Sequence, residues 1–166
     1  MHETVAYIRD LLKDADLQFT HPPVIVGGRA MEYYGLRQSG EDVDLVITDD
    51  DYQRLAKSYP DKRKDIWGDL GVVLWPFEIW RSIMYFDYQF FLQDAVRADG
   101  LCIVSMDRLL LTRVYAMDVE KYRNDLVLIK KKYLEQYGNG DFLALSHARA
   151  HIYEKQPVIL GGKYEV

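Results

Sequence analysis

The stretch VIVGGRAMEYYGLRQSGEDVDLVITDD, residues 24–50, decides the fold of this chain. A short apolar run ends at Gly27 and Gly28, a helix-forming segment follows, and a second apolar run carries Asp42 and Asp44 separated by one valine. Successive side chains of a strand point to opposite faces, so the two aspartates share one face while Val43 points into the core. Two neighbouring carboxylates repel each other unless a positive charge lies between them.

The carboxylate pair has two interpretations. It is typical of a magnesium site, because Mg²⁺ takes oxygen ligands and often binds through one or two carboxylates plus substrate phosphates. The other interpretation is a strand end that exposes two acids to water. Gly27 and Gly28 favour the first, since glycine at a strand-to-helix turn lets backbone amides approach a phosphate closely. The same glycines would also fit a tight turn that binds nothing.

Hydrophobic periodicity predicts an α+β fold with an α/β-like core, in which helices dominate the C-terminal half. The predicted helices cover residues 4–16, 29–34, 52–59, 85–96, 106–117, 120–137 and 141–155, and the predicted strands cover residues 23–26, 42–48 and 101–105. Residues 71–80 are predicted to be extended, and Pro76 within them indicates a strand edge or a bend between two short strands. Asp49, Asp50 and Asp51 read as the N-cap and first-turn acids of the third helix. Residues 60–70 read as a polar surface loop. We expect a core over residues 1–104 and a helical extension over residues 105–166, packed as one compact domain.

Composition narrows the function classes. The chain has 166 residues, is 49% hydrophobic and carries a formal charge of −5, which argues against broad non-specific binding to nucleic acid. The single cysteine, Cys102, is expected to be a buried thiol in a reducing compartment. The sequence shows neither a signal peptide nor an apolar span for a membrane, so we expect a soluble cytoplasmic protein. His147 and His151 have zinc-pair spacing, but they fit a packed or solvated helical pair better because no third ligand is evident nearby.

The segment GGRAMEYYGLRQSGEDVDLVI resembles the signature of the polymerase-beta-like nucleotidyltransferase superfamily. It is most similar to the small bacterial members, which include minimal nucleotidyltransferases, abortive-infection toxins and aminoglycoside or lincosamide nucleotidyltransferases. The matching positions are Gly27, Gly28, Ala30, Gly35, Arg37, Ser39, Asp42 and Asp44. The resemblance implies a nucleotidyltransferase fold, with a short mixed sheet flanked by helices, and Mg²⁺ as the cofactor.

The resemblance also implies a third carboxylate between apolar residues on a neighbouring strand. Glu78, in PFEIW, has that setting, and Asp87 and Asp69 are the alternatives. An edge strand with one wet face would place Glu78 there equally well. The expected catalytic and metal-binding set is therefore Asp42, Asp44 and Glu78.

Basic residues are implied around the nucleotide. Gly27, Gly28, Arg37 and Ser39 would bind it from the motif itself. The later segment LLLTRVYAMDVEKYRNDL resembles a K-x-x-A…K/R…D stretch of the small members, and it adds Arg113 and Lys121. Arg113 stands where lysine is commoner, and the two side chains present charge differently. Lys121 and Asp125 would alternatively form an ordinary surface pair four residues apart.

The expected activity is transfer of a nucleoside monophosphate from a nucleoside triphosphate to a hydroxyl group of a small molecule, an RNA or a protein. The acidic charge weighs against RNA. The alternative is a catalytically inactive descendant that binds a nucleotide or a protein partner, as an antitoxin does. The tyrosine-rich C-terminal helices are also compatible with a homodimer face.

Overall fold

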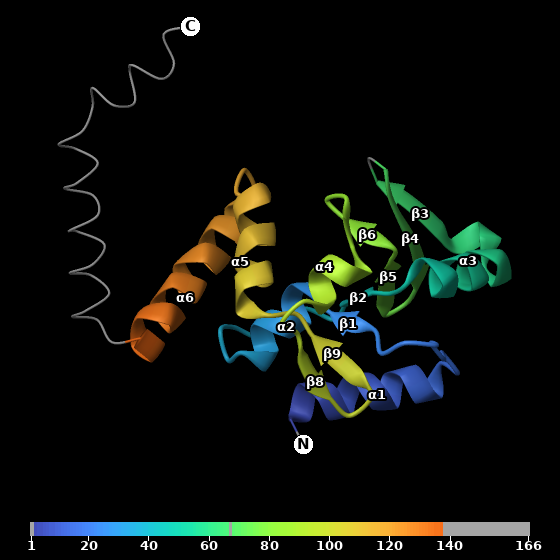
Figure 1. The fold of residues 1–166 in the computed structure, drawn as a ribbon, viewed down its shortest axis with the longest axis horizontal. Coiled ribbons are helices and arrows are strands. Elements are labelled where there is room, and N and C mark those ends of the chain that lie inside the picture. The colour runs from blue at the N-terminus through green and yellow to red at the C-terminus, as the bar shows by residue number, and fades with distance from the viewer. Residues whose placement is uncertain (1, 67, 138–166) are drawn as a thin grey trace, which may run out of the picture. The chain divides into compact units, whose positions relative to one another are not determined.

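The computed structural model describes residues 2–66 and 68–137 (Figure 1). By its internal contacts the chain divides into two compact units, residues 1–126 and residues 127–166. None of the helices in the described ranges combines the length and the apolarity needed to cross a membrane.

Helices and strands alternate from α1 to α3, after which five strands follow one another, and α6 begins in the first unit and continues into the second. The helices are α1 (Glu3–Asp14), α2 (Gly27–Tyr33), α3 (Asp49–Ser58), α4 (Tyr88–Leu92), α5 (Met106–Tyr115) and α6 (Glu120–Tyr137), with a short 3-10 helix over Pro60–Lys62. The strands are β1 (Val24–Ile25), β2 (Val43–Val46), β3 (Arg63–Ile66), β4 (Asp69–Leu74), β5 (Phe77–Trp80), β6 (Ser82–Ile83), β7 (Phe86–Asp87), β8 (Val96–Ala98) and β9 (Leu101–Ile103).

The main sheet is mixed, which confirms the α+β class. Its strands lie in the order β3, β4, β5, β2, β1, β9, β8, and the β6–β7 hairpin is separate. Strand β2 pairs parallel with β5 on one side and antiparallel with β1 on the other. The strand that carries the aspartate motif therefore lies in the middle of the sheet, where its backbone is fixed from both sides.

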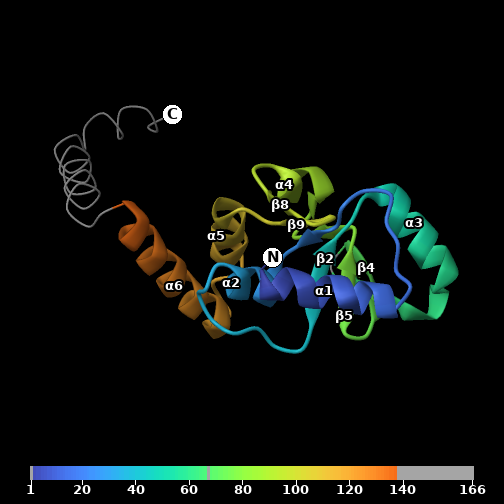
Figure 2. The same cartoon turned by 90° about the horizontal axis from the view of Figure 1, so that it is seen from below.

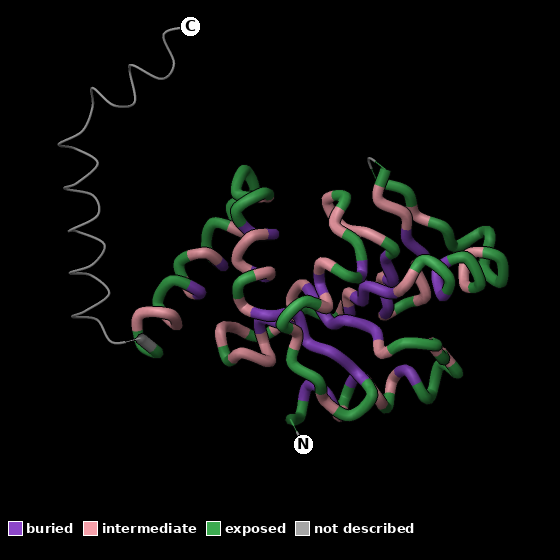
Figure 3. Tube along the Cα trace, viewed as in Figure 1, coloured by how far each residue is buried: buried purple, intermediate pink, exposed green. Residues whose placement is uncertain are grey.

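The core follows the central strands. Val24, Ile25, Leu45 and Ile103 are fully buried, and the buried parts of the trace in Figure 3 run along these strands. Helix α1 buries one stripe of apolar side chains and packs against α2, beside which it lies in Figure 2. Helix α2 also contacts β2, so it connects α1 to the strand that carries Asp44.

Several elements agree with the sequence predictions. Helix α6 has the predicted bounds, and Ser105 caps α5 by accepting a hydrogen bond from the Arg108 amide. The N-cap of α3 is Thr48 rather than an aspartate, and the three acids that follow form the first turn. The predicted helix over residues 141–155, with its two histidines, lies outside the described residues.

Two predictions were wrong. Residues 60–70 contain β3, which pairs antiparallel with β4 and whose side chains are mostly exposed. A polar edge strand lacks the alternation that identifies a strand from sequence, so tertiary pairing alone creates it. Residues 85–96 form β7, the short helix α4 and the start of β8 instead of one helix. Asp87 caps α4, and the left-handed conformation of Asp94 (φ 58°) breaks the helical path beyond it.

Candidate functional site

The central strands bring the predicted carboxylates together. Asp44 on β2 and Glu78 on β5 are direct partners in the parallel ladder, so their side chains leave the sheet on the same face. Asp42 precedes Asp44 by two residues and belongs to that face as well. The flanking residues Val43 and Phe77 are buried on the opposite face, as the alternation predicts.

Two glycines make room for the aspartates. Gly27 adopts a left-handed conformation (φ +62°), and a Cβ atom there would lie 2.1 Å from Oδ2 of Asp44. A Cβ atom at Gly40 would lie 2.8 Å from Oδ1 of Asp42. Only glycine fits at Gly27, because any side chain would be strained and would collide with the carboxylate. The glycine turn and the aspartate pair are thus one structural unit.

The environment of Asp44 disfavours its charged form. Burial raises the pKa of Asp44 to about 6, and the nearby carboxylates of Asp42 and Glu78 push it in the same direction. A hydrogen bond from Trp80 and the positive charge of Arg113 act against this rise without cancelling it. A bound cation would relieve the repulsion, so the site has the electrostatics of a place that receives positive charge.

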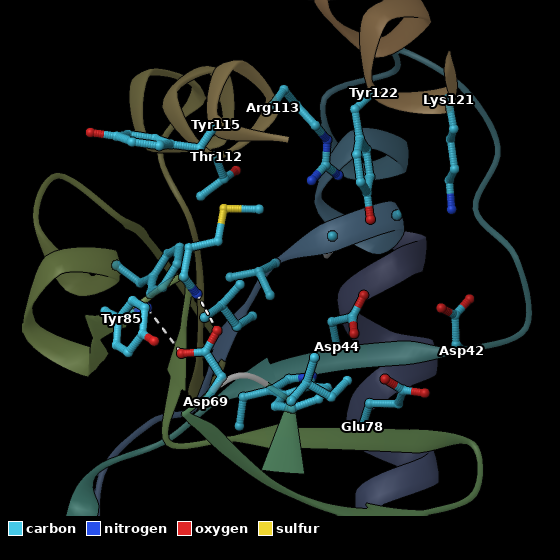
Figure 4. Close-up of a pocket in the computed structure, with 18 residues that line it drawn as sticks. Asp42, Asp44, Asp69, Glu78, Tyr85, Thr112, Arg113, Tyr115, Lys121 and Tyr122 are labelled. Atoms are coloured by element: carbon cyan, nitrogen blue, oxygen red, sulfur yellow. Dashed lines mark hydrogen bonds between the residues drawn. The ribbon is translucent and has the colours of Figure 1, made fainter. Parts of the chain in front are cut away.

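Two basic side chains face the acids across the cavity. Arg113 extends from α5 and Lys121 from the start of α6, and both point toward Asp42 and Asp44 in Figure 4. None of the ion pairs among the described residues joins these cations to these two acids. Opposite charges therefore line one space without neutralising each other directly.

Arg113 is fixed in this position by a buried acid. Its Nε donates to Oδ2 of Asp125 at 2.9 Å, and its guanidinium carbon lies 4.7 Å from the centroid of the Tyr122 ring. Arg37 binds the same carboxylate, with its Nε at 2.6 Å from Oδ1. Asp125 is only 1% exposed. The alternative prediction, a surface ion pair between Lys121 and Asp125, is therefore wrong.

Glu78 already has a cationic partner. Nζ of Lys64 on β3 lies 3.0 Å from each carboxylate oxygen, and it also lies 5.3 Å from the centroid of the Trp80 ring. Gly71 on β4 permits this arrangement, because a Cβ atom there would lie 2.6 Å from the Trp80 ring. Sequence reasoning missed Lys64, since its strand was expected to be a loop.

The alternatives to Glu78 have structural roles. Asp69 accepts hydrogen bonds from Oγ of Ser82 and from the amides of Met84 and Tyr85 in the β6–β7 hairpin. Asp87 accepts from the Phe90 amide at the start of α4. Glu78 is the only one of the three candidates that is a ladder partner of Asp44.

The remaining predicted residues divide between the cavity and its surroundings. Gly27 and Gly28 line the cavity, whereas Arg37 and Ser39 do not. The Ser39 amide donates to Glu32, and Arg37 reaches Asp125. The nucleotide-binding roles expected for Arg37 and Ser39 remain predictions.

The cavity has a volume of about 690 Å³, which is in the range of small-molecule sites. One side carries the charged groups described above. The other side is apolar and aromatic, and it includes residues that the sequence did not single out: Ile66, Ile83, Met84, Tyr85, Phe91 and Tyr115.

Asp42 and Asp44 fit a divalent cation as its protein ligands. They supply hard oxygen donors, neither forms an ion pair with a described residue, and burial together with the neighbouring carboxylates raises the pKa of Asp44. Within residues 2–66 and 68–137, no group of three or more acidic, histidine or cysteine side chains is arranged to hold a metal ion. A cation here would complete its shell with water or substrate oxygens.

No model of a known protein family matches the chain, and no curated protein matches it.

Proposed function

We propose that this protein transfers a nucleoside monophosphate from a nucleoside triphosphate to a hydroxyl group, with Mg²⁺ as cofactor. The observation that carries the proposal is the pairing of Asp44 with Glu78, on a face where Asp42 also lies, opposite the cations Arg113 and Lys121. A ligand that carries both negative and positive charge fits between these groups, because its negative charge lies near the cations and its metal ion lies near the acids. A metal-bound triphosphate has that character.

Each side chain then has a role. Asp42 and Asp44 hold the metal, while Arg113 and Lys121 neutralise phosphate oxygens from the other side. Bound Mg²⁺ supplies charge neutralisation at the transferring phosphate. The acceptor oxygen forms a bond to the α-phosphorus, the bond from that phosphorus to the bridging oxygen breaks, and pyrophosphate leaves. Glu78, the ladder partner of Asp44, would accept the proton of the acceptor hydroxyl.

The acceptor would be a small molecule, a protein or an RNA, and the net charge of −5 disfavours RNA. We would identify it by incubating the protein with labelled nucleotides, Mg²⁺ and a cell extract, and by asking which molecule becomes labelled. The same assay measures the base preference.

The variant Asp44→Asn tests the proposal directly. It removes a metal ligand with almost no change of shape, so we expect at least a ~100-fold loss of transfer, given that the metal contributes several kcal/mol. Thermal stabilisation by ATP with Mg²⁺ should disappear as well. The matched control is Asp50→Asn, an exposed acid on α3 that is outside the cavity lining and should retain both properties. Full stabilisation by Mg²⁺ and ATP in Asp44→Asn would contradict the proposal.

The second candidate is a non-catalytic domain that binds a nucleotide or a protein partner. The Lys64–Glu78 pair favours it, because a lysine that contacts both oxygens of the third carboxylate occupies the place where an acceptor hydroxyl would donate its proton. Under this alternative, Lys64→Met would still bind the nucleotide, and neither wild type nor Lys64→Met would transfer it.

Under the first proposal, the wild-type protein labels an acceptor. Co-purification of an antitoxin-like partner is not expected to be necessary for that labelling.

A further inference from the structure

The β6–β7 hairpin has an unfavourable turn. Its strands are joined by two residues, Met84 and Tyr85, which both adopt left-handed backbone conformations (φ 55° and 63°). Positive φ at both central positions defines a type I′ turn, which strongly prefers Asn-Gly or Asp-Gly. Large side chains are strained at such positions, and strain of this kind concentrates at ligand-binding sites. The turn therefore presents these two side chains at a cost to stability.

The surrounding residues hold the turn in this conformation. The Asp69 carboxylate accepts hydrogen bonds from the backbone amides of Met84 and Tyr85, and Figure 4 draws these hydrogen bonds. A Cβ atom at Gly68 would lie 3.0 Å from Cε1 of Tyr85, so the absence of a side chain there leaves space for the ring. Tyr85 is nevertheless 78% exposed, which means that packing in the core does not explain its presence.

Both turn residues line the apolar side of the cavity. Tyr115 stands across from Tyr85 in Figure 4 and is 66% exposed. The centroid of its ring lies 5.6 Å from that of Phe86, and the Phe86 ring stacks on Phe90 with centroids 4.0 Å apart, so rings outside the cavity lining connect Tyr115 to β7 and α4. Two exposed tyrosines beside the apolar residues of the cavity are suited to stacking on a flat ring, because the ring meets aromatic faces and displaces water from them.

We propose that Met84, Tyr85 and Tyr115 form a subsite that binds a flat aromatic ring of a substrate. The subsite adjoins the charged side of the same cavity, so the ring belongs either to the base of the nucleotide or to an aromatic acceptor. This inference rests on the proposed function for the identity of the substrate, but the binding of a ring can be tested without phosphate or metal.

The variant Tyr85→Ala, with Tyr85→Phe as its matched control, tests the subsite. Calorimetry would measure the dissociation constants of tripolyphosphate, of ATP, GTP, CTP and UTP, and of p-cresol as a ring-bearing acceptor probe, all with Mg²⁺. The four free nucleosides would be titrated by NMR without metal. Loss of one stacking partner corresponds to about a tenfold weaker affinity. Tyr85→Phe should retain the wild-type affinities.

The pattern of losses identifies the source of the ring. If the base occupies the subsite, Tyr85→Ala weakens at least one nucleoside triphosphate about tenfold and leaves tripolyphosphate unchanged. If an acceptor occupies it, the triphosphates are unchanged and p-cresol binding falls. The inference is overturned if wild type and Tyr85→Ala bind every ring ligand with equal affinity. It is also overturned if Tyr85→Ala weakens the binding of tripolyphosphate as much as the binding of the ring ligands. Failure of wild-type protein to bind tripolyphosphate counts against the proposed function alone, because the nucleosides still report on the subsite.

A second variant separates binding from folding. Met84→Asn combined with Tyr85→Gly installs the turn sequence that a type I′ hairpin prefers. We expect an unchanged or higher melting temperature together with the same loss of ring affinity as in Tyr85→Ala. A clearly lower melting temperature would show that the two side chains stabilise the hairpin, and it would overturn the argument from strain.

Discussion

At the scale of single residues, Asp44 carries the strongest evidence for a binding site. Its carboxylate lies against the backbone of Gly27, beside two other acids, in an environment that raises its pKa to about 6. A charged carboxylate in this buried, negatively charged environment lowers the stability of the protein, and a neutral residue there would make the fold more stable. Function is the simplest reason for its presence.

The variant Asp44→Asn should be more stable than wild type at pH 7 in the presence of a chelator. The carboxyl loses its proton near pH 4 in the unfolded chain and near pH 6 in the folded one, so the stability of wild type falls as pH rises between these values. Asparagine has no proton to lose. The advantage of the variant should therefore grow from pH 4 to pH 6 and then stay constant, with an upper bound of about 3 kcal/mol. Denaturant unfolding at several pH values measures it, and equal stability at pH 7 would contradict the assignment.

At the scale of elements, α3 is attached to the preceding chain through its first turn. Asp51 is 2% exposed and accepts hydrogen bonds from Thr20 and from the N-cap residue Thr48. Burial alone would raise the pKa of Asp51, but these bonds and that of Arg54 outweigh it and lower the pKa. One acid of the aspartate run is thus a structural link, although all three looked alike in sequence.

Asp51→Ala and Asp50→Ala should differ in stability. The first leaves two threonine donors without their acceptor inside the protein, which costs about 3 kcal/mol, since hydrogen bonds to a charged group are strong. The second removes an exposed acid and should stay within about 0.5 kcal/mol of wild type. Chemical denaturation of both variants checks the difference. Equal losses would mean that the acids act only through the helix dipole.

At the scale of the whole molecule, Asp125 joins segments that are far apart in the chain. Its carboxylate binds Arg37, which follows α2, and Arg113 on α5, which lies 12 residues before it. Arg113 is only 6% exposed, so both groups of that ion pair are buried. The cluster fixes the cation that faces Asp44, and it therefore connects the stability of the first unit to the geometry of the cavity.

Asp125→Ala should cost about 3–5 kcal/mol, because it leaves a buried guanidinium without its counter-charge. The control is Glu135→Ala on α6, where the exposed pair with Lys131 at 3.9 Å is worth less than about 1 kcal/mol. Urea unfolding distinguishes the two variants. A loss below 1 kcal/mol for Asp125→Ala would show that water already solvates the arginines.

Local sequence carried much of the information about this protein. The period of the apolar residues predicted α6 and the strand that carries Asp44, because each depends on contacts within a short stretch. The positive φ at Gly27 is likewise a property that the residue type makes possible. The polar strand β3 was missed, since nothing in its own residues requires pairing and β4 alone provides it.

The sequence by itself determined which residues can form the aspartate face and the glycine turn, because alternation along a strand and the freedom of glycine are local properties. Only the tertiary structure decided that Glu78 is the partner of Asp44, that Lys64 contacts it, and that Met84 and Tyr85 reach the same cavity. These relations depend on which strands become neighbours. Which strands become neighbours in a mixed sheet depends on long-range packing, and no short stretch of the chain specifies that packing.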